Sequence, residues 1–129
     1  LTAARAHGER MGRRIITVAD SPGFATSRLG LVLGLEAIRM VEQDVASPED
    51  IDTAMALGCG YPMGPFILCD FVGLDTLNMI GEIMYEEYRE ARYAPPPLLK
   101  RIVAMGRFGR KTGMGFYDWS GDKPTALPL

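Results

Sequence analysis

Residues 20–44 read DSPGFATSRLGLVLGLEAIRMVEQD and contain the main helix that the sequence predicts. The first four residues are typical of a turn, and we expect a helix over 26–44. Its apolar residues form two stripes on different faces: Leu29, Leu33, Ala37, Met40 and Val41 in the first, and Leu31, Leu35 and Ile38 in the second. A helix that is apolar on several faces is buried on several faces. We therefore expect other helices to cover it, and a second subunit to cover part of it.

An acidic side chain lies beside the first stripe. A carboxylate leaves water only with a partner. We therefore expect Glu36 to be buried and paired, with a solvated carboxylate as the alternative.

Four further helices follow in the sequence. Ser47 is expected to cap a helix that begins at Pro48 and ends at Gly58. The next helices are expected from Pro65 to near Gly73, from an N-cap at Asp75 to about Tyr88, and over 98–105, after the extended prolines 95–97. Residues 120–129 are rich in Ser, Gly, Asp, Lys and Pro and suit a frayed tail. The sequence thus predicts a mainly α-helical domain of about five helices.

The N-terminal residues have a different pattern. Residues 1–11 predict a helix with Gly12 as its stop, and the β-branched run 15–18 predicts a buried strand. A helix followed by a strand is the repeating unit of an α/β sheet, yet one strand makes no sheet. Because the first residue is Leu and not Met, we expect the chain to be a piece of a longer protein.

Composition excludes several classes of protein. The 129 residues, 47% of them hydrophobic, suit one globular domain, and a net charge of −2 gives no electrostatic reason to expect a nucleic-acid partner. The two cysteines, Cys59 and Cys69, have neither a metal-binding nor a disulfide spacing, so we expect buried thiols and no metal. No apolar run approaches the ~20 residues that span a bilayer, and no signal-peptide pattern is visible in these residues. We therefore expect a cytoplasmic protein without a membrane partner.

Several motifs occur in a specific order along the chain. They are Asp20-Ser21-Pro22-Gly23-Phe24, Ser27-Arg28-Leu29, Glu36-Ala37, Ile51-Asp52, Pro62-Met63-Gly64-Pro65, Asp70, Gly73-Leu74-Asp75 and Gly109-Arg-Lys-Thr-Gly-Met-Gly-Phe-Tyr117. Together they resemble the C-terminal domain of the 3-hydroxyacyl-CoA dehydrogenases. The resemblance implies a helical fold like the C-terminal domain of 6-phosphogluconate dehydrogenase over 20–119. Residues 1–19 then resemble the last helix and strand of a Rossmann NAD-binding domain, and 120–129 are a tail.

The resemblance also implies a function. The family oxidises L-3-hydroxyacyl-CoA to 3-oxoacyl-CoA with NAD in fatty-acid β-oxidation, and its dinucleotide fold and catalytic His–Glu pair belong to the N-terminal domain. The chain has no Gly-x-Gly-x-x-Gly, and its one histidine, His7, lies upstream of the predicted strand, where a solvated ring is expected. The resemblance therefore implies a substrate-closing and dimerisation domain that is inactive alone and binds no cofactor. In the whole enzyme, acyl-CoA and a second copy of the chain are the expected partners.

One position of this domain contributes to the family's active site. It is an asparagine just before an arginine, and here the pair is Ser27-Arg28. Serine offers one hydroxyl where asparagine offers two N–H donors and a carbonyl, so Ser27 is expected to reach the substrate through a water. The alternatives are a small residue with no catalytic role and a subgroup with a different substrate. Arg28 is a further substrate-proximal candidate.

The glycine-rich segment 109–117 lacks the order and the strand–loop–helix context of a phosphate-binding loop. We expect a close-packed turn that delivers Phe116, Tyr117 and Trp119 to the core or an interface. The alternative is contact with CoA phosphate or with the facing domain, for which Lys111 is the candidate.

Two other functions stay open from the sequence. The first is a non-catalytic helical module for dimerisation or binding. The second is the matching domain of a hydroxy-acid dehydrogenase that does not use CoA, an alternative that the serine at position 27 supports.

Overall fold

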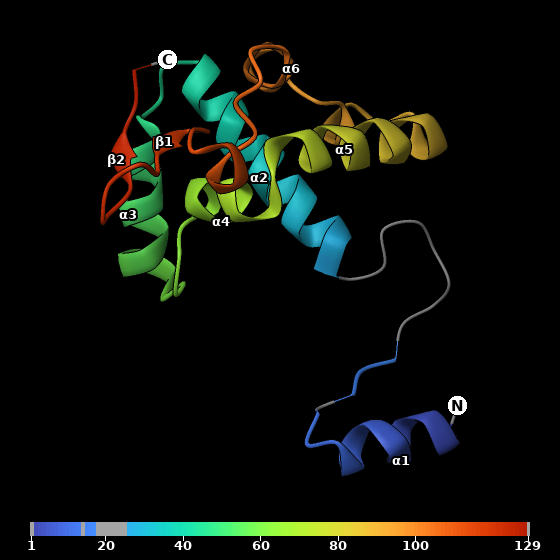
Figure 1. Ribbon diagram of the computed structural model, residues 1–129. Helices are drawn as coiled ribbons and strands as arrows, with labels where there is room; N and C mark the ends of the chain where they lie inside the picture. The colour runs from blue at the N-terminus through green and yellow to red at the C-terminus, as the bar shows by residue number, and fades with distance from the viewer. Residues whose placement is uncertain (1, 14, 18–25, 129) are drawn as a thin grey trace.

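Five helices, α2 to α6, form the body of the molecule (Figure 1). The computed structural model describes residues 2–13, 15–17 and 26–128. The elements in chain order are α1 (Thr2–Arg10), α2 (Thr26–Glu42), α3 (Pro48–Cys59), α4 (Pro65–Val72), α5 (Leu74–Tyr88), a 3₁₀ turn (Ala91–Tyr93), α6 (Pro97–Ala104), a second 3₁₀ turn (Arg110–Thr112), β1 (Tyr117–Asp118) and β2 (Thr125–Ala126). The predicted mainly α-helical domain of about five helices is confirmed.

Helix α2 lies at the centre of the body and packs against α3, α4, α5 and α6. The second predicted stripe is buried, because Leu31, Leu35 and Ile38 are each at most 2% exposed. The first stripe is covered only in part: Ala37 is buried, while Leu29 is 72% exposed. One chain therefore covers one stripe of α2 and leaves part of the other to solvent.

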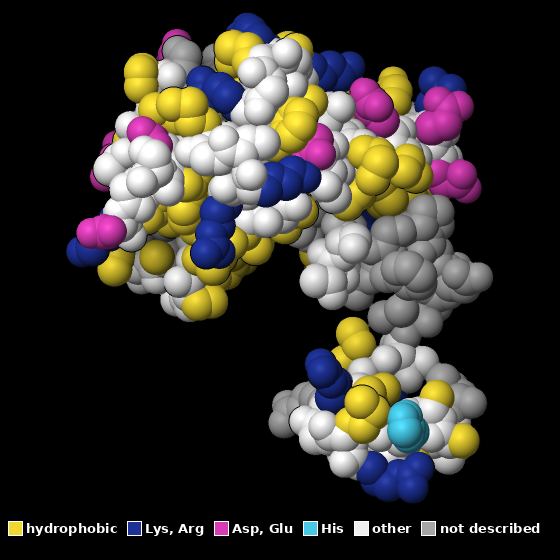
Figure 2. Space-filling view, viewed as in Figure 1, with side chains coloured by type: hydrophobic (Ala, Val, Ile, Leu, Met, Phe, Trp, Pro, Cys, Tyr) yellow, Lys and Arg dark blue, Asp and Glu magenta, His cyan; other side chains and the backbone are white. Residues whose placement is uncertain are grey.

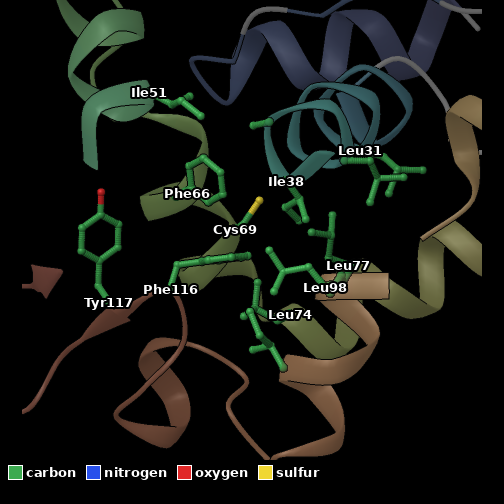
Figure 3. Close-up of a cluster of buried hydrophobic side chains, with 14 of the residues drawn as sticks. Leu31, Ile38, Ile51, Phe66, Cys69, Leu74, Leu77, Leu98, Phe116 and Tyr117 are labelled. Carbon is green, nitrogen blue, oxygen red and sulfur yellow. The ribbon is translucent and has the colours of Figure 1, made fainter. Parts of the chain in front are cut away.

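The buried side chains of all five helices meet in one core (Figure 3). Phe66 of α4 meets Phe116, which follows the second 3₁₀ turn, edge to face with ring centroids 4.7 Å apart. Both rings are at most 1% exposed. The C-terminal segment is thus a part of the core, and the body is not complete at the end of α6.

The ends of α3 follow from local chemistry. The hydroxyl of Ser47 accepts a hydrogen bond from the backbone N–H of Asp50 at 3.1 Å, so the predicted cap is confirmed. The predicted end at Gly58 is wrong by two residues: Gly60, with φ of 69°, takes the left-handed position that terminates the helix.

The start of α5 also differs from the prediction. The N-cap is Gly73, with φ of 106°, and Asp75 lies inside the first turn. The carboxylate of Asp75 instead pairs with Lys111, at 2.7 Å from Oδ1 to Nζ. Asp75 therefore does not take the predicted N-cap position, and its carboxylate instead pairs with a lysine that is distant in the sequence.

Two side chains of α2 hold the loop between α5 and α6. Nη2 of Arg39 donates to the carbonyls of residues 91, 92 and 94 at 3.0, 3.0 and 3.1 Å. Oε2 of Glu42 accepts the N–H of Leu98 at 2.7 Å in the first turn of α6. Glu36 pairs with Arg39 at 3.2 Å but remains 63% exposed, so the expected burial of Glu36 is wrong.

The structure differs from the sequence prediction at both ends of the chain. The predicted helix at the N-terminus is present as α1, but residues 15–17 form no strand and Ile16 is 69% exposed. No strand of the described residues lies beside them to complete a sheet, and residues 18 and 20–24 lie outside the described part. At the other end, the predicted frayed tail contains β2, which pairs antiparallel with β1 in the register Tyr117–Ala126.

The cysteines differ in environment. Cys69 of α4 is buried as expected, whereas Cys59, near the end of α3, is exposed. Cys59 is the last residue of α3, directly before the terminating Gly60.

Candidate functional site

An apolar pocket of about 230 Å³ lies between α2, α4 and α5, and Ser27 is one of its lining residues. The lining residues are Thr26, Ser27, Gly30, Leu31, Leu33, Gly34, Pro65, Leu68, Cys69, Val72, Leu77 and Ile80. Thr26 and Ser27 are exposed, whereas Leu31, Cys69 and Leu77 are buried. The buried wall of the pocket is therefore apolar, and its exposed lining residues include Thr26 and Ser27 together with Leu68 and Val72.

Two glycines of α2 shape this pocket. A Cβ at Gly30 would meet nothing within 4 Å, so its absence leaves open space along the helix. A Cβ at Gly34 would lie 2.9 Å from Sγ of Cys69, so α2 and α4 approach closely only because residue 34 has no side chain. Burial raises the pKa of the Cys69 thiol to about 12, and the inner wall therefore carries no thiolate at neutral pH.

Arg28 is directed elsewhere. Its guanidinium carbon lies 5.1 Å from the ring centroid of Tyr88 and 5.7 Å from that of Tyr93, at the far end of α5 and in the loop after it. A guanidinium at these distances from aromatic faces makes cation–π contacts. Arg28 thus fastens the first turn of α2 to the end of α5, and it is not part of the pocket lining.

Lys111 also has its own environment. Its ammonium pairs with Asp75 and lies 5.7 Å from the ring centroid of Phe108. The hydrogen bond from Lys111 lowers the pKa of Asp75. Ser27, Arg28 and Lys111 are therefore not brought together in one site.

Two buried carboxylates have a structural role that the sequence did not predict, although both belong to the family motifs. The first, Asp52 of α3, is 5% exposed. Its Oδ1 accepts the N–H of Phe66 at 2.7 Å, and its Oδ2 accepts the N–H of Ile67 at 3.1 Å and the hydroxyl of Tyr117 at 2.8 Å. Asp52 thus satisfies free N–H groups at the start of α4 and ties that helix to β1.

The second buried carboxylate holds the glycine-rich segment. Asp70 of α4 is fully buried. Its Oδ1 accepts the N–H of Phe116 at 3.0 Å, and its Oδ2 accepts the N–H of Tyr117 at 3.0 Å and the indole Nε1–H of Trp119 at 2.8 Å. The predicted close-packed turn that delivers aromatic residues to the core is confirmed.

Burial raises the pKa of both acids, and the hydrogen bonds that they accept oppose this rise. The sequence held a signal for Asp70, because it is the one charged residue in the apolar run PFILCDFV of α4. Such a residue implies buried donors around it.

The chemistry available to the described residues is limited. No group of three or more His, Cys, Asp or Glu side chains that could hold a metal ion occurs among them. His7 is exposed on α1, and Figure 2 shows its ring at the surface. Among the described residues, no helix has the length and apolarity needed to cross a membrane. The lining of the pocket beside Ser27 offers apolar contacts and the hydroxyls of Thr26 and Ser27.

Comparison with known proteins identifies close relatives. The family model of the 3-hydroxyacyl-CoA dehydrogenase C-terminal domain matches residues 23–119. A 3-hydroxybutyryl-CoA dehydrogenase of Mycobacterium tuberculosis is 46% identical over 109 residues, and the match covers 84% of this chain and 38% of that protein. The human mitochondrial hydroxyacyl-coenzyme A dehydrogenase is 47% identical over 110 residues, which cover 84% of this chain and 35% of that protein.

The fold agrees with a solved structure of the same kind. The crystal structure of an (S)-3-hydroxybutyryl-CoA dehydrogenase from Ralstonia eutropha matches with a TM-score of 0.88 and 41% identity, and the match covers 93% of this chain and 42% of that one. The chain thus spans about two-fifths of the length of the relatives that it matches. With the family model matched over most of the chain, this protein belongs to the 3-hydroxyacyl-CoA dehydrogenase family, as its C-terminal domain.

Proposed function

We propose that this chain is the substrate-closing and dimerisation domain of an NAD-dependent enzyme that oxidises L-3-hydroxyacyl-CoA to 3-oxoacyl-CoA. The match to the family model over residues 23–119 carries the proposal, and the place of Ser27 in the lining of an apolar pocket supports it. In this assignment residues 1–19 belong to the NAD-binding domain and residues 120–129 to a tail. The two free thiols suit a reducing compartment, and we propose the cytoplasm.

The proposed reaction divides between two domains. The NAD-binding domain would hold the nicotinamide, which would supply the acceptor for a hydride from C3 of the substrate, and a base on that domain would accept the hydroxyl proton. Ser27 contributes a hydrogen bond to the oxygen on C3, directly or through a water. Arg28 and Lys111 contribute indirectly, because they hold the first turns of α2 and α5.

A fusion protein tests this function. Residues 20–129 replace the corresponding domain of the M. tuberculosis relative, behind its dinucleotide-binding domain. We expect acetoacetyl-CoA-dependent oxidation of NADH at 340 nm, and neither activity nor NADH binding by the 129-residue chain alone. A folded fusion protein that is inactive contradicts the proposal. Reduction of acetoacetate as readily as acetoacetyl-CoA favours a hydroxy-acid dehydrogenase that does not use CoA.

Ser27 has a measurable share in this activity. In the fusion protein, Ser27→Ala is expected to raise the activation free energy by on the order of 2–4 kcal/mol, as the loss of one well-placed polar contact does. Ser27→Asn, which restores the family's residue, is expected to keep or increase turnover. Ser120→Ala, in the exposed turn after β1, is the control and should change neither kcat nor KM. Unchanged kinetics in Ser27→Ala assigns Ser27 a structural role only.

The exposed part of α2 is the proposed dimer surface. Leu29 lies with Gly30, Val32, Leu33 and Tyr61 along a mostly apolar groove, whose lining also includes Thr26 and Glu36 and which the described residues leave open. Apolar surface of this kind marks an interface. We expect a homodimer in sedimentation at several concentrations and a monomer for Leu29→Glu. Met105→Glu, at a side chain 56% exposed after α6, should stay dimeric. A monomer at every concentration of the unmodified chain removes dimerisation from the proposal.

A further inference from the structure

We propose that the exposed face of α6 and the turn that follows it form a docking surface for an acidic segment of a partner protein. We call it the basic surface, and its cations are Lys100, Arg101, Arg107 and Arg110. It lies outside the site described above, because the described residues that line the pocket beside Ser27 all come from 26–80. The inference is therefore independent of the dehydrogenase assignment.

The charges of the chain are separated along the sequence and in space. Residues 91–117 contain six Lys and Arg residues and no Asp or Glu, whereas the remaining residues contain eight and sixteen, respectively. On the face shown in Figure 2, Lys and Arg side chains lie over α6 and the segment after it, and Asp and Glu side chains gather at the C-terminal end of α5. A chain with a negative net charge thus has a region of positive potential, which attracts carboxylates.

The cations of the basic surface have no acid beside them. Lys100, Arg101 and Arg110 are exposed and form no ion pair with another described residue, whereas four other arginines each pair with a glutamate. Arg107 is half-buried, and its Nη2 donates to the carbonyl of Gly115 at 2.6 Å, which holds the charge in place without neutralising it. Three exposed cations are therefore available to a partner.

The exposed face of α6 suits the approach of another main chain. The apolar side chains of α6 belong to the core. Its solvent side carries Lys100 and Arg101, with the short side chains of Pro97 and Ala104 one turn away on either side. Residues three and four apart lie on one face of a helix, so these four form a single strip. A partner segment can approach the short side chains while the long cations reach its carboxylates.

This composition favours a protein over a membrane or a nucleic acid. Because α6 directs its apolar side chains to the core, it has no apolar face to insert among lipids. Tight binding to duplex DNA uses about six to ten phosphate contacts, which exceeds the three exposed cations. Two or three carboxylates on one face of a helix match that number, and Met105, 56% exposed at the end of α6, gives such a helix an apolar contact.

Fluorescence anisotropy with a labelled peptide tests the inference on the 129-residue chain. The probe is an alanine-based helical peptide with glutamates on one face, and its matched form has glutamine at the same positions. Each exposed ion pair strengthens an association by up to about fivefold. With three pairs, we expect the glutamate peptide to bind about tenfold more tightly at low salt. The difference should disappear near 1 M salt, where the Debye length is about 3 Å.

Charge reversal locates the binding. In Lys100→Glu/Arg101→Glu, the preference for the glutamate peptide is expected to fall below about twofold, and Lys100→Gln/Arg101→Gln should give an intermediate value. Arg10→Glu/Arg13→Glu is the matched control, because it changes the net charge equally at two other exposed arginines. This variant should keep the preference. Circular dichroism checks that the variants remain folded.

Three results overturn the inference. Equal binding of the two peptides, including no binding of either, removes the preference for carboxylates. An equal loss in the control variant means that net charge attracts the peptide and the basic surface does not. Binding to phosphatidylglycerol vesicles or duplex DNA that the charge reversal abolishes, while the two peptides bind equally, assigns the surface to another class of partner. None of these results depends on the activity of the fusion protein, so the two proposals fail separately.

Discussion

Asp70→Ala is expected to lower the free energy of unfolding by about 3–5 kcal/mol, because two buried donors and one part-buried donor lose their acceptor. These donors are the N–H groups of Phe116 and Tyr117 and the indole of Trp119. An unsatisfied buried donor costs about 1–3 kcal/mol. For a domain whose total stability is about 5–15 kcal/mol, such a loss is large.

Urea unfolding measures the effect with a probe inside the network. Trp119 is the only tryptophan of the chain, so its fluorescence reports the C-terminal segment, and circular dichroism reports the helices. Asp122→Ala, an exposed acid in the turn before β2, is the control and should change stability by less than about 0.5 kcal/mol. If Asp70→Ala lowers the free energy of unfolding by less than about 1 kcal/mol, water replaces the carboxylate as acceptor. The role of Asp70 as the anchor of the C-terminal segment is then wrong.

Gly109→Ala is expected to destabilise the chain by about 4 kcal/mol through backbone strain and overlap together. Gly109 has φ of 114° and ψ of −146°, a region that L-residues with a side chain rarely adopt. A Cβ there would also overlap the backbone of Asp70. The wall that it meets is the main chain of α4, which cannot rotate away as a side chain does.

Gly113→Ala separates the two contributions. Gly113 lies in the same turn with φ of 82°, and a Cβ there meets nothing within 4 Å. Only the left-handed backbone penalty of about 1–2 kcal/mol applies to it. Thermal unfolding of both variants gives the comparison. Equal losses for the two substitutions refute the close approach between the turn and α4.

The sequence predicted the helices well where their ends depend on neighbouring residues. Ser47 and Pro48 begin α3, and the prolines before α6 place its start, because capping and fixed φ angles act over a few residues. Asp75 shows the limit of such rules. It lies where an N-cap is expected, but it pairs with Lys111, 36 residues later, and only the folded chain brings that cation close.

The candidate site was predicted only in part, because it too depends on contacts between residues that are far apart in the sequence. The motif placed Ser27 at the start of α2, and the pocket beside it depends on α4 and α5, whose approach the sequence does not give. Arg28 follows Ser27 in the sequence but stacks on Tyr88 and Tyr93, about 60 residues away. The motif predicts no role for Asp52, because its partner Tyr117 lies 65 residues away in the sequence.

The two faces of the eight-residue helix α4 have different roles, and this has an evolutionary consequence. Phe66 and Asp70 face the core and hold the C-terminal turn, whereas Leu68 and Val72 line the pocket and are 41% and 48% exposed. Substitutions at 68 and 72 reshape the pocket while the anchors at 66 and 70 keep the helix in place. The lining of this pocket can therefore change between descendants of this domain through a few surface substitutions, with the architecture inherited intact.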